Sequence, residues 1–124
     1  MRIALDTMVL AYAEGVDGPE RQARTMTVLS RFIEVDIVLP TQTIGELYNV
    51  LTRKSRLSTA DARRRLSDWI EGYRLHPADE AVFASALALA ADKGLQFWDA
   101  LILATAADAD CLLLLSEDFQ EGFV

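Results

Sequence analysis

Short apolar segments alternate with longer segments of helical character along the whole chain, and this alternation constrains the fold more than any other feature. Three strongly apolar segments, too short for core helices, cover residues 2–5, 35–39 and 111–115. A weaker candidate strand covers residues 73–76. The predicted helices cover residues 19–33, 43–54, 58–72, 79–93 and 99–109. This order is typical of a three-layer α/β sandwich, in which helices flank a mostly parallel central sheet of four to five strands.

Several residues at the ends of these segments support the predicted boundaries. Ser58, followed by Asp61 three residues later, is the pattern of a helix N-cap. Gly94 is placed to end the alanine-rich helix before it. Thr41 or Thr43 can cap the helix that follows the second strand.

The composition fits one domain over residues 1–124 and restricts its partners. The net charge is -7, which argues against charge-driven binding to nucleic acid unless carboxylates hold divalent cations. Cys111 is the only cysteine, which excludes an intramolecular disulfide and a thiolate zinc site. We find neither a signal-like start nor an apolar run that could cross a bilayer, so we expect a cytoplasmic protein that makes no membrane contact.

Two acidic residues follow predicted strands, at the edge where open parallel sheets bind ligands. Asp6 follows the first strand, and Asp118 comes three residues after the last one. In such sheets, ligands bind beyond the carboxyl ends of the strands, where the strand order reverses. Both strands are apolar enough to predict central positions in the sheet. If the two strands are neighbours, Asp6 and Asp118 face one crevice.

Asp99 and Glu46 have ordinary structural explanations beside a functional one. Asp99 opens an almost wholly apolar helix, so its carboxylate either caps that helix or binds a ligand. Glu46 lies nearly opposite the apolar stripe of its helix, where a glutamate is usually exposed to solvent. The residues alone leave both alternatives open.

Four blocks of sequence, spread over nearly the whole chain, carry a resemblance to a known family. The blocks are LDTMVLAY at residues 5–12, GELYNVLTR at 45–53, GLQFWDALI at 94–102 and LLSEDFQ at 114–120. In order and spacing they resemble the PIN-domain proteins, and within them the toxins of VapBC toxin–antitoxin pairs. The chain departs from the family pattern at Met8, where Asn is common, and at Ser116, where Thr is frequent. It also stops before the strand with which the family usually ends.

The resemblance implies a PIN-like, Rossmann-like fold and a metal-dependent endoribonuclease that cleaves RNA. It also implies a cognate antitoxin that covers the site, and a homodimer. The acidic positions of the family fall on Asp6, Glu46, Asp99 and Asp118. The resemblance therefore favours a site role for Glu46 and Asp99 over their ordinary explanations.

These residues suggest a hypothesis for the chemistry. Carboxylate and water oxygens are the ligands that suit Mg²⁺ or Mn²⁺. We expect one or two such ions to be held by Asp6, Asp99 and Asp118, with Glu46 binding directly or through water. A metal-activated water would then attack a phosphodiester bond of RNA in line. Thr7 and Ser116 are expected to orient a carboxylate or a water.

RNA also needs cations for its backbone phosphates, and the chain offers a candidate group after the Glu46 helix. Arg53, Lys54 and Arg56 are candidates to contact RNA there, although a solvated helix surface is the more common explanation for each of them. The alternative to a nuclease is a non-catalytic PIN-fold module that binds RNA or a protein partner without cleavage. Metal binding separates the two hypotheses.

Overall fold

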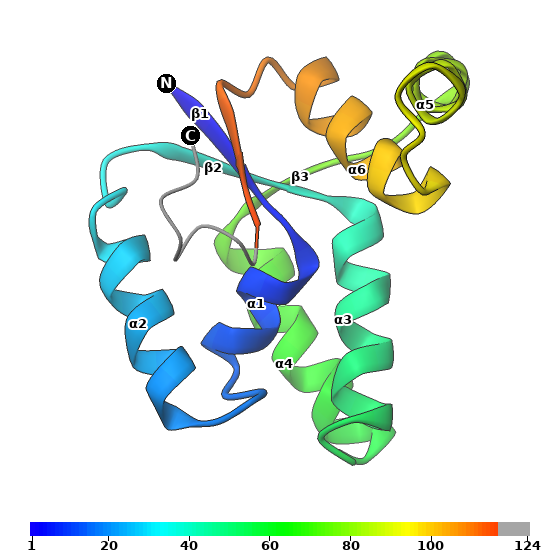
Figure 1. The fold of residues 1–124 in the computed structure, drawn as a ribbon. Coiled ribbons are helices and arrows are strands. Elements are labelled where there is room, and N and C mark those ends of the chain that lie inside the picture. The colour runs from blue at the N-terminus through cyan, green and yellow to red at the C-terminus, as the bar shows by residue number, and fades with distance from the viewer. Residues whose placement is uncertain (117–124) are drawn as a thin grey trace.

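The computed structural model describes residues 1–116, and the catalytic candidate Asp118 lies outside these described residues (Figure 1). The strands are β1 (Arg2–Leu5), β2 (Asp36–Pro40), β3 (Arg74–His76) and β4 (Leu113–Leu115). The helices are α1 (Thr7–Ala13), α2 (Pro19–Ser30), α3 (Thr41–Arg53), α4 (Thr59–Gly72), α5 (Glu80–Lys93) and α6 (Phe97–Asp108). The α/β class predicted from the alternation of segments is confirmed.

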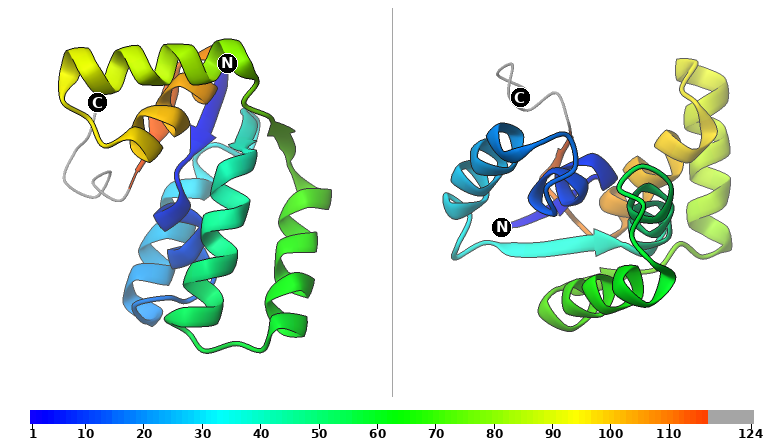
Figure 2. Two further views of the ribbon diagram at one scale, coloured as in Figure 1. Left: turned by 90° about the vertical axis from the view of Figure 1, so that its right-hand side faces the viewer. Right: turned by 90° about the horizontal axis from the view of Figure 1, so that it is seen from below.

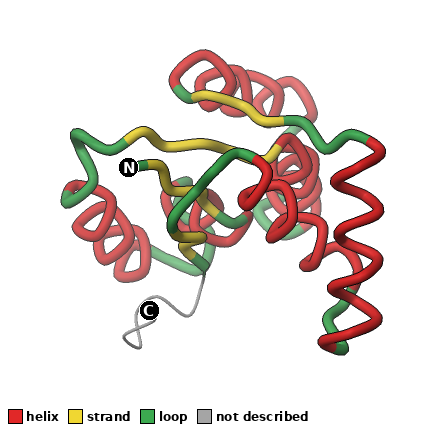
Figure 3. Tube along the Cα trace, turned by 90° about the horizontal axis from the view of Figure 1, so that it is seen from above, coloured by secondary structure: helices red, strands yellow, loops and turns green. Residues whose placement is uncertain are grey.

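The four strands, drawn in yellow in Figure 3, form one parallel sheet in the order β3-β2-β1-β4. Ile3 of β1 is paired with Ile37 of β2 on one side and with Leu113 of β4 on the other. The chain builds outward from β1 through β2 to β3, and then returns to the other side of β1. The strand order therefore reverses between β1 and β4, which is where such sheets bind ligands.

Helices cover both faces of the sheet, as expected of a parallel sheet. Ile3 and Leu5 of β1 belong to the main apolar cluster, whereas Ala4, which points to the opposite face, is also fully buried. A second, smaller cluster joins α5 to α6, and α6 also contacts β2 and β4. Figures 1 and 2 place the α5–α6 pair at the opposite end of the molecule from α2.

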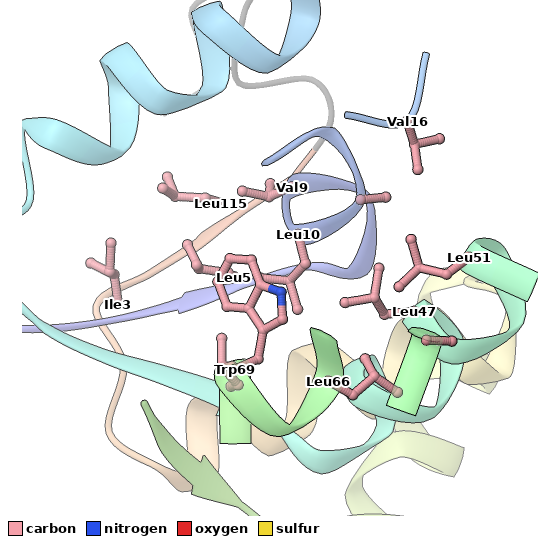
Figure 4. Packing of buried hydrophobic residues seen from close by; sticks show 13 residues of the cluster. Ile3, Leu5, Val9, Leu10, Val16, Leu47, Leu51, Leu66, Trp69 and Leu115 are labelled. Carbon is pink, nitrogen blue, oxygen red and sulfur yellow. The ribbon is translucent and has the colours of Figure 1, made fainter. Parts of the chain in front are cut away.

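The main apolar cluster fixes α1, α3 and α4 against one another (Figure 4). Leu10 of α1, Leu47 of α3 and Leu66 of α4 meet in it, and Leu47 is fully buried. Burying one such side chain contributes roughly 1.5–3 kcal/mol. This packing sets the start of α1, which follows Asp6, beside the first turns of α3, which carry Glu46.

Several local predictions are confirmed and others are wrong. Ser58 caps α4 by accepting from the backbone N–H of Asp61 at 3.1 Å, and Gly94 ends α5 in the left-handed conformation at φ 69°. The expected caps of α3 are wrong: its N-cap is Pro40, and the hydroxyl of Thr43 instead donates to the Pro40 carbonyl at 2.7 Å.

Two further differences concern α1 and β4. The sequence did not predict α1, whose short span is buried on most sides and so shows no amphipathic period. β4, expected in the centre, lies at the edge of the four strands of residues 1–116. None of the helices in this part of the chain is long and apolar enough to cross a bilayer.

Candidate active site

The ends of β1 and β4 lie side by side and bring Asp6 and Ser116 to one edge of the sheet. The backbone N–H of Asp6 donates to the carbonyl of Leu115 at 2.8 Å, directly before Ser116. The Asp6 carboxylate accepts from the backbone N–H of Thr7 at 2.7 Å and so caps α1. The condition that these two strands are neighbours is met, so Asp6 lies at the strand-order reversal; Asp118 falls outside the described residues.

Glu46 reaches the same edge from α3, and both of its carboxylate oxygens accept hydrogen bonds. The hydroxyl of Thr7 donates to Oε1 at 2.5 Å, and the side-chain amide of Gln42 donates to Oε2 at 2.8 Å. Thr7 is buried and Glu46 is half-buried. The prediction that Thr7 orients a carboxylate therefore has a direct geometric counterpart, and Glu46 does not project freely into solvent.

Asp99 lies in the first turn of α6, where the cap is supplied by another residue. The N-cap is Gln96, whose side-chain oxygen accepts from the backbone N–H of Asp99 at 3.3 Å. Of the two explanations that the sequence left open for Asp99, the helix cap is excluded, because Gln96 occupies that position. Its side chain is exposed, at the positive end of the helix dipole, which favours a carboxylate.

A shallow pocket of about 430 Å³ connects the first turns of α3 and α6. Its lining consists of Gln42, Gly45, Glu46, Asn49 and Trp98. Gln42 also donates to the carbonyl of Trp98 at 3.2 Å, directly before Asp99. Glu46 and Asp99 make no ion pair with any of residues 1–116, and negative charge without a cation favours binding of one.

The donors at this edge suit a hard divalent cation in kind, because all are oxygens. Within the described part of the chain, no three Asp, Glu, His or Cys side chains are close enough together to form a metal-binding group. Asp6 and Asp99 are instead connected to Glu46 through their neighbours, Thr7 and Trp98, and the three carboxylates do not form a close cluster.

The candidate RNA-binding cations lie further along α3. Arg53 is seven residues after Glu46, which corresponds to about 10 Å along a helix axis, and its side chain is exposed. Lys54 forms an ion pair of 3.2 Å with Asp17. Arg56, also exposed, follows the helix. The structure does not bring these three side chains into contact with the acids.

Gln42 and Met8 also lie beside these residues, next to Glu46 and Thr7 respectively. Gln42 was not predicted, although its position one turn before Glu46 on the same helix is a usable signal. Met8, which occupies the position of a common Asn, packs partly buried against the main apolar cluster. It contributes a thioether rather than an amide beside Thr7.

Comparisons with known proteins agree with this architecture. A comparison with solved structures gives VapC20 of Mycobacterium tuberculosis, described as a sarcin–ricin loop cleaving toxin, at a TM-score of 0.76 and 16% identity, covering 98% of this chain and 96% of that one. A toxin–antitoxin complex from Klebsiella pneumoniae gives a TM-score of 0.70 at 17% identity, covering 98% and 92%. FitAcB from Neisseria gonorrhoeae gives 0.61 at 25% identity, covering 90% and 84%.

The family comparison is more direct. No curated protein matches the chain by sequence. The model of the PIN domain, however, matches residues 3–120, a span that contains all four candidate acids. The match includes β1 and β4, whose ends form the crevice, and extends beyond the described residues to Asp118. The chain therefore belongs to the PIN domain family.

Proposed function

We propose that this chain is a metal-dependent endoribonuclease and the toxin of a toxin–antitoxin pair. The observation that carries the proposal is the set of hydrogen bonds around Glu46. Thr7, which follows Asp6, and Gln42, which bonds the residue before Asp99, both donate to its carboxylate. Three acids from β1, α3 and α6 are thereby linked at the strand-order reversal, where a parallel sheet binds its ligand.

The acids supply ligands for Mg²⁺ or Mn²⁺. We expect one or two ions to be held by Asp6, Asp99 and Asp118, with Glu46 binding directly or through a water. A bound divalent ion supplies an activated water and positive charge beside the scissile phosphate. Thr7 donates to the Glu46 carboxylate and orients it, and we expect Ser116, which follows β4, to orient a water or Asp6.

The substrate and the partner follow from the similar structures. Because one of them is described as a toxin that cleaves the sarcin–ricin loop, we propose RNA phosphodiester bonds as the substrate. We also propose that the chain acts in the cytoplasm. Others are described as toxin–antitoxin complexes, so we propose a cognate antitoxin that covers the crevice. We also propose a homodimer, because the apolar side chains of Phe83 and Leu87 on α5 are exposed and offer a surface for a second copy.

Cleavage of RNA by the purified chain tests the proposal. The chain should cleave RNA in the presence of Mg²⁺ or Mn²⁺ and stop when EDTA is added. Asp6→Asn and Asp99→Asn should abolish cleavage and keep the circular dichroism spectrum of the folded protein. Asp92→Asn, on the exposed surface of α5, is the matched control and should retain full activity.

Two results would contradict the proposal. Undiminished cleavage by Asp99→Asn would remove Asp99 from the site. Binding of RNA without cleavage, at millimolar Mg²⁺ or Mn²⁺, would favour the non-catalytic binding module instead. The antitoxin is tested by looking for an adjacent reading frame that encodes a small DNA-binding protein; on co-expression, that protein should co-purify with the chain and suppress cleavage.

A further inference from the structure

We propose that Gln42 is a positioning residue for the nuclease site, through which α3 and the first turn of α6 are held in register. The inference rests on the proposed function, because it assigns Gln42 an effect on the same acids. Gln42 neither lies in the predicted set of site residues nor carries a charge. Its importance follows from where its single amide group donates hydrogen bonds.

The amide nitrogen of Gln42 serves two acceptors from different parts of the chain. Nε2 donates to Oε2 of Glu46 at 2.8 Å, one helical turn further along α3. The same nitrogen donates to the carbonyl of Trp98 at 3.2 Å, across 56 residues of sequence. An NH₂ group carries two hydrogens, so both bonds can form at once. The residue after Trp98 is Asp99, so the amide fixes Glu46 relative to the backbone that carries Asp99.

The orientation of the amide follows from this network. Both neighbours, the Glu46 carboxylate and the Trp98 carbonyl, only accept hydrogen bonds. A flipped amide would place its own carbonyl oxygen against two other oxygens and lose both hydrogen bonds. The nitrogen-inward orientation is therefore required by its surroundings.

The amide oxygen of Gln42 supports the view that the two N–H donors are the functional part of this side chain. Oε1 of Gln42 is buried, and within residues 1–116 it has no hydrogen-bond partner. A buried acceptor without a partner costs free energy, and such atoms in a folded protein call for an explanation. An apolar side chain of similar size would avoid this cost but could not orient Glu46.

Glu46 is consequently held from both sides by neutral donors. Thr7 donates to Oε1 from the start of α1, and Gln42 donates to Oε2 from α3. Neither donor carries a positive charge, so the carboxylate keeps its full attraction for a cation. Partners of this kind, which orient a ligand without neutralising it, set its affinity for metal and its activity.

Gln42→Met tests the inference, since methionine keeps the length of the side chain and removes its donors. We expect kcat for RNA cleavage to fall about 10- to 100-fold, with KM for RNA unchanged. The dissociation constant for Mn²⁺, measured by calorimetry on the free protein, should rise by about 10-fold or more. Unchanged kcat and unchanged Mn²⁺ affinity would overturn the inference.

Gln22→Met is the matched control for loss of a glutamine donor. Gln22 is also half-buried and donates from Nε2 to a backbone carbonyl, that of Ala13, at 3.0 Å. It lies on α2, away from the acids. We expect this variant to change thermal stability as Gln42→Met does, while retaining kcat and Mn²⁺ affinity. An equal loss of kcat in both variants would reduce Gln42 to a structural role and overturn the inference.

A double-mutant cycle tests whether Gln42 acts through Glu46. In a Glu46→Gln background, Gln42→Met should cause little additional loss of kcat, because the carboxylate that it orients is gone. Fully additive losses would overturn the inference. The proposed function fails separately: if the unaltered chain cleaves no RNA, the nuclease is rejected, and the Mn²⁺ affinities of the Gln42 and Gln22 variants still decide the positioning role.

Discussion

The hydroxyl of Thr7 donates a hydrogen bond of 2.5 Å to Oε1 of Glu46, across 39 residues of sequence. Thr7 is the first residue of α1 and is 6% exposed, so water does not compete freely for this hydroxyl. The bond joins the end of β1, which carries Asp6, to the polar side of α3. This hydrogen bond fixes the Glu46 carboxylate beside the end of β1, although the position of Glu46 on its helix is otherwise that of an ordinary surface residue.

Thr7→Val should therefore reduce both stability and cleavage. Loss of a hydrogen bond to a charged acceptor costs about 1.5–3 kcal/mol in the free energy of unfolding. Urea denaturation measures this loss, and kcat measures the misplacement of Glu46. Thr27→Val, on the exposed side of α2, is the control and should leave kcat unchanged. Wild-type kcat in Thr7→Val would show that the bond does not serve the site.

Gly94→Ala should destabilise the fold by about 1–2 kcal/mol, the cost of placing a side chain in the left-handed region. Gly94 has φ 69° and ends α5 shortly before α6 begins. Thermal denaturation followed by circular dichroism measures the change. Gly72→Ala, at the end of α4, is the matched control, since an added Cβ there meets no atom within 4 Å and φ is not positive. Equal melting temperatures for the two variants would contradict the argument.

The thiol of Cys111 should react slowly with iodoacetamide at neutral pH. Burial raises the pKa of this thiol above its usual range; Arg2 lowers the pKa, whereas Asp36 and Asp110 raise it further. Since the thiolate is the reactive form, a raised pKa leaves less of it at any pH below that value. The rate should increase with pH and should recover that of an ordinary cysteine in urea. A rate in the folded protein equal to that in urea would refute this reading.

Arg53→Gln should weaken the binding of RNA without changing kcat at saturating substrate. If Arg53 contacts a phosphate, its removal reduces the slope of log affinity against log salt by about 0.7, the value for single strands. Titration of RNA into the Asp6→Asn variant at several salt concentrations measures this slope. Arg31→Gln, an exposed arginine after α2, should leave the slope unchanged. An unchanged slope for Arg53→Gln would assign this residue to the solvated surface.

Most helices and strands could be predicted from short stretches of sequence, because capping residues, glycines and apolar runs define where they begin and end. Ser58 and Gly94 delimit α4 and α5 through hydrogen bonds and backbone angles that depend only on nearby residues. The helix α1 was missed because its side chains are buried on most sides by α2 and α3, contacts that no short window of sequence reveals. The same limit applies to the cap of α3 at Pro40.

The site could be predicted only in part. Asp6 followed from the end of an apolar strand and the rule for open sheets. Glu46 could be singled out only by the family resemblance, because its hydrogen bond to Thr7 depends on how α1 and α3 pack. Gln42 was missed for a related reason: its bond to Trp98 crosses 56 residues, and a neutral side chain gives no charge pattern.

The pairing of β1 with β4 means that the crevice is assembled from the two ends of the described chain. Arg2–Leu5 is synthesised long before Leu113–Leu115, the strand with which it pairs on that side of the sheet. The bond from Asp6 to Leu115 therefore cannot form until synthesis has passed residue 115. A nascent chain that is still shorter has no crevice between β1 and β4. If the chain cuts RNA as proposed, a chain whose synthesis has not yet reached β4 lacks one side of the proposed site.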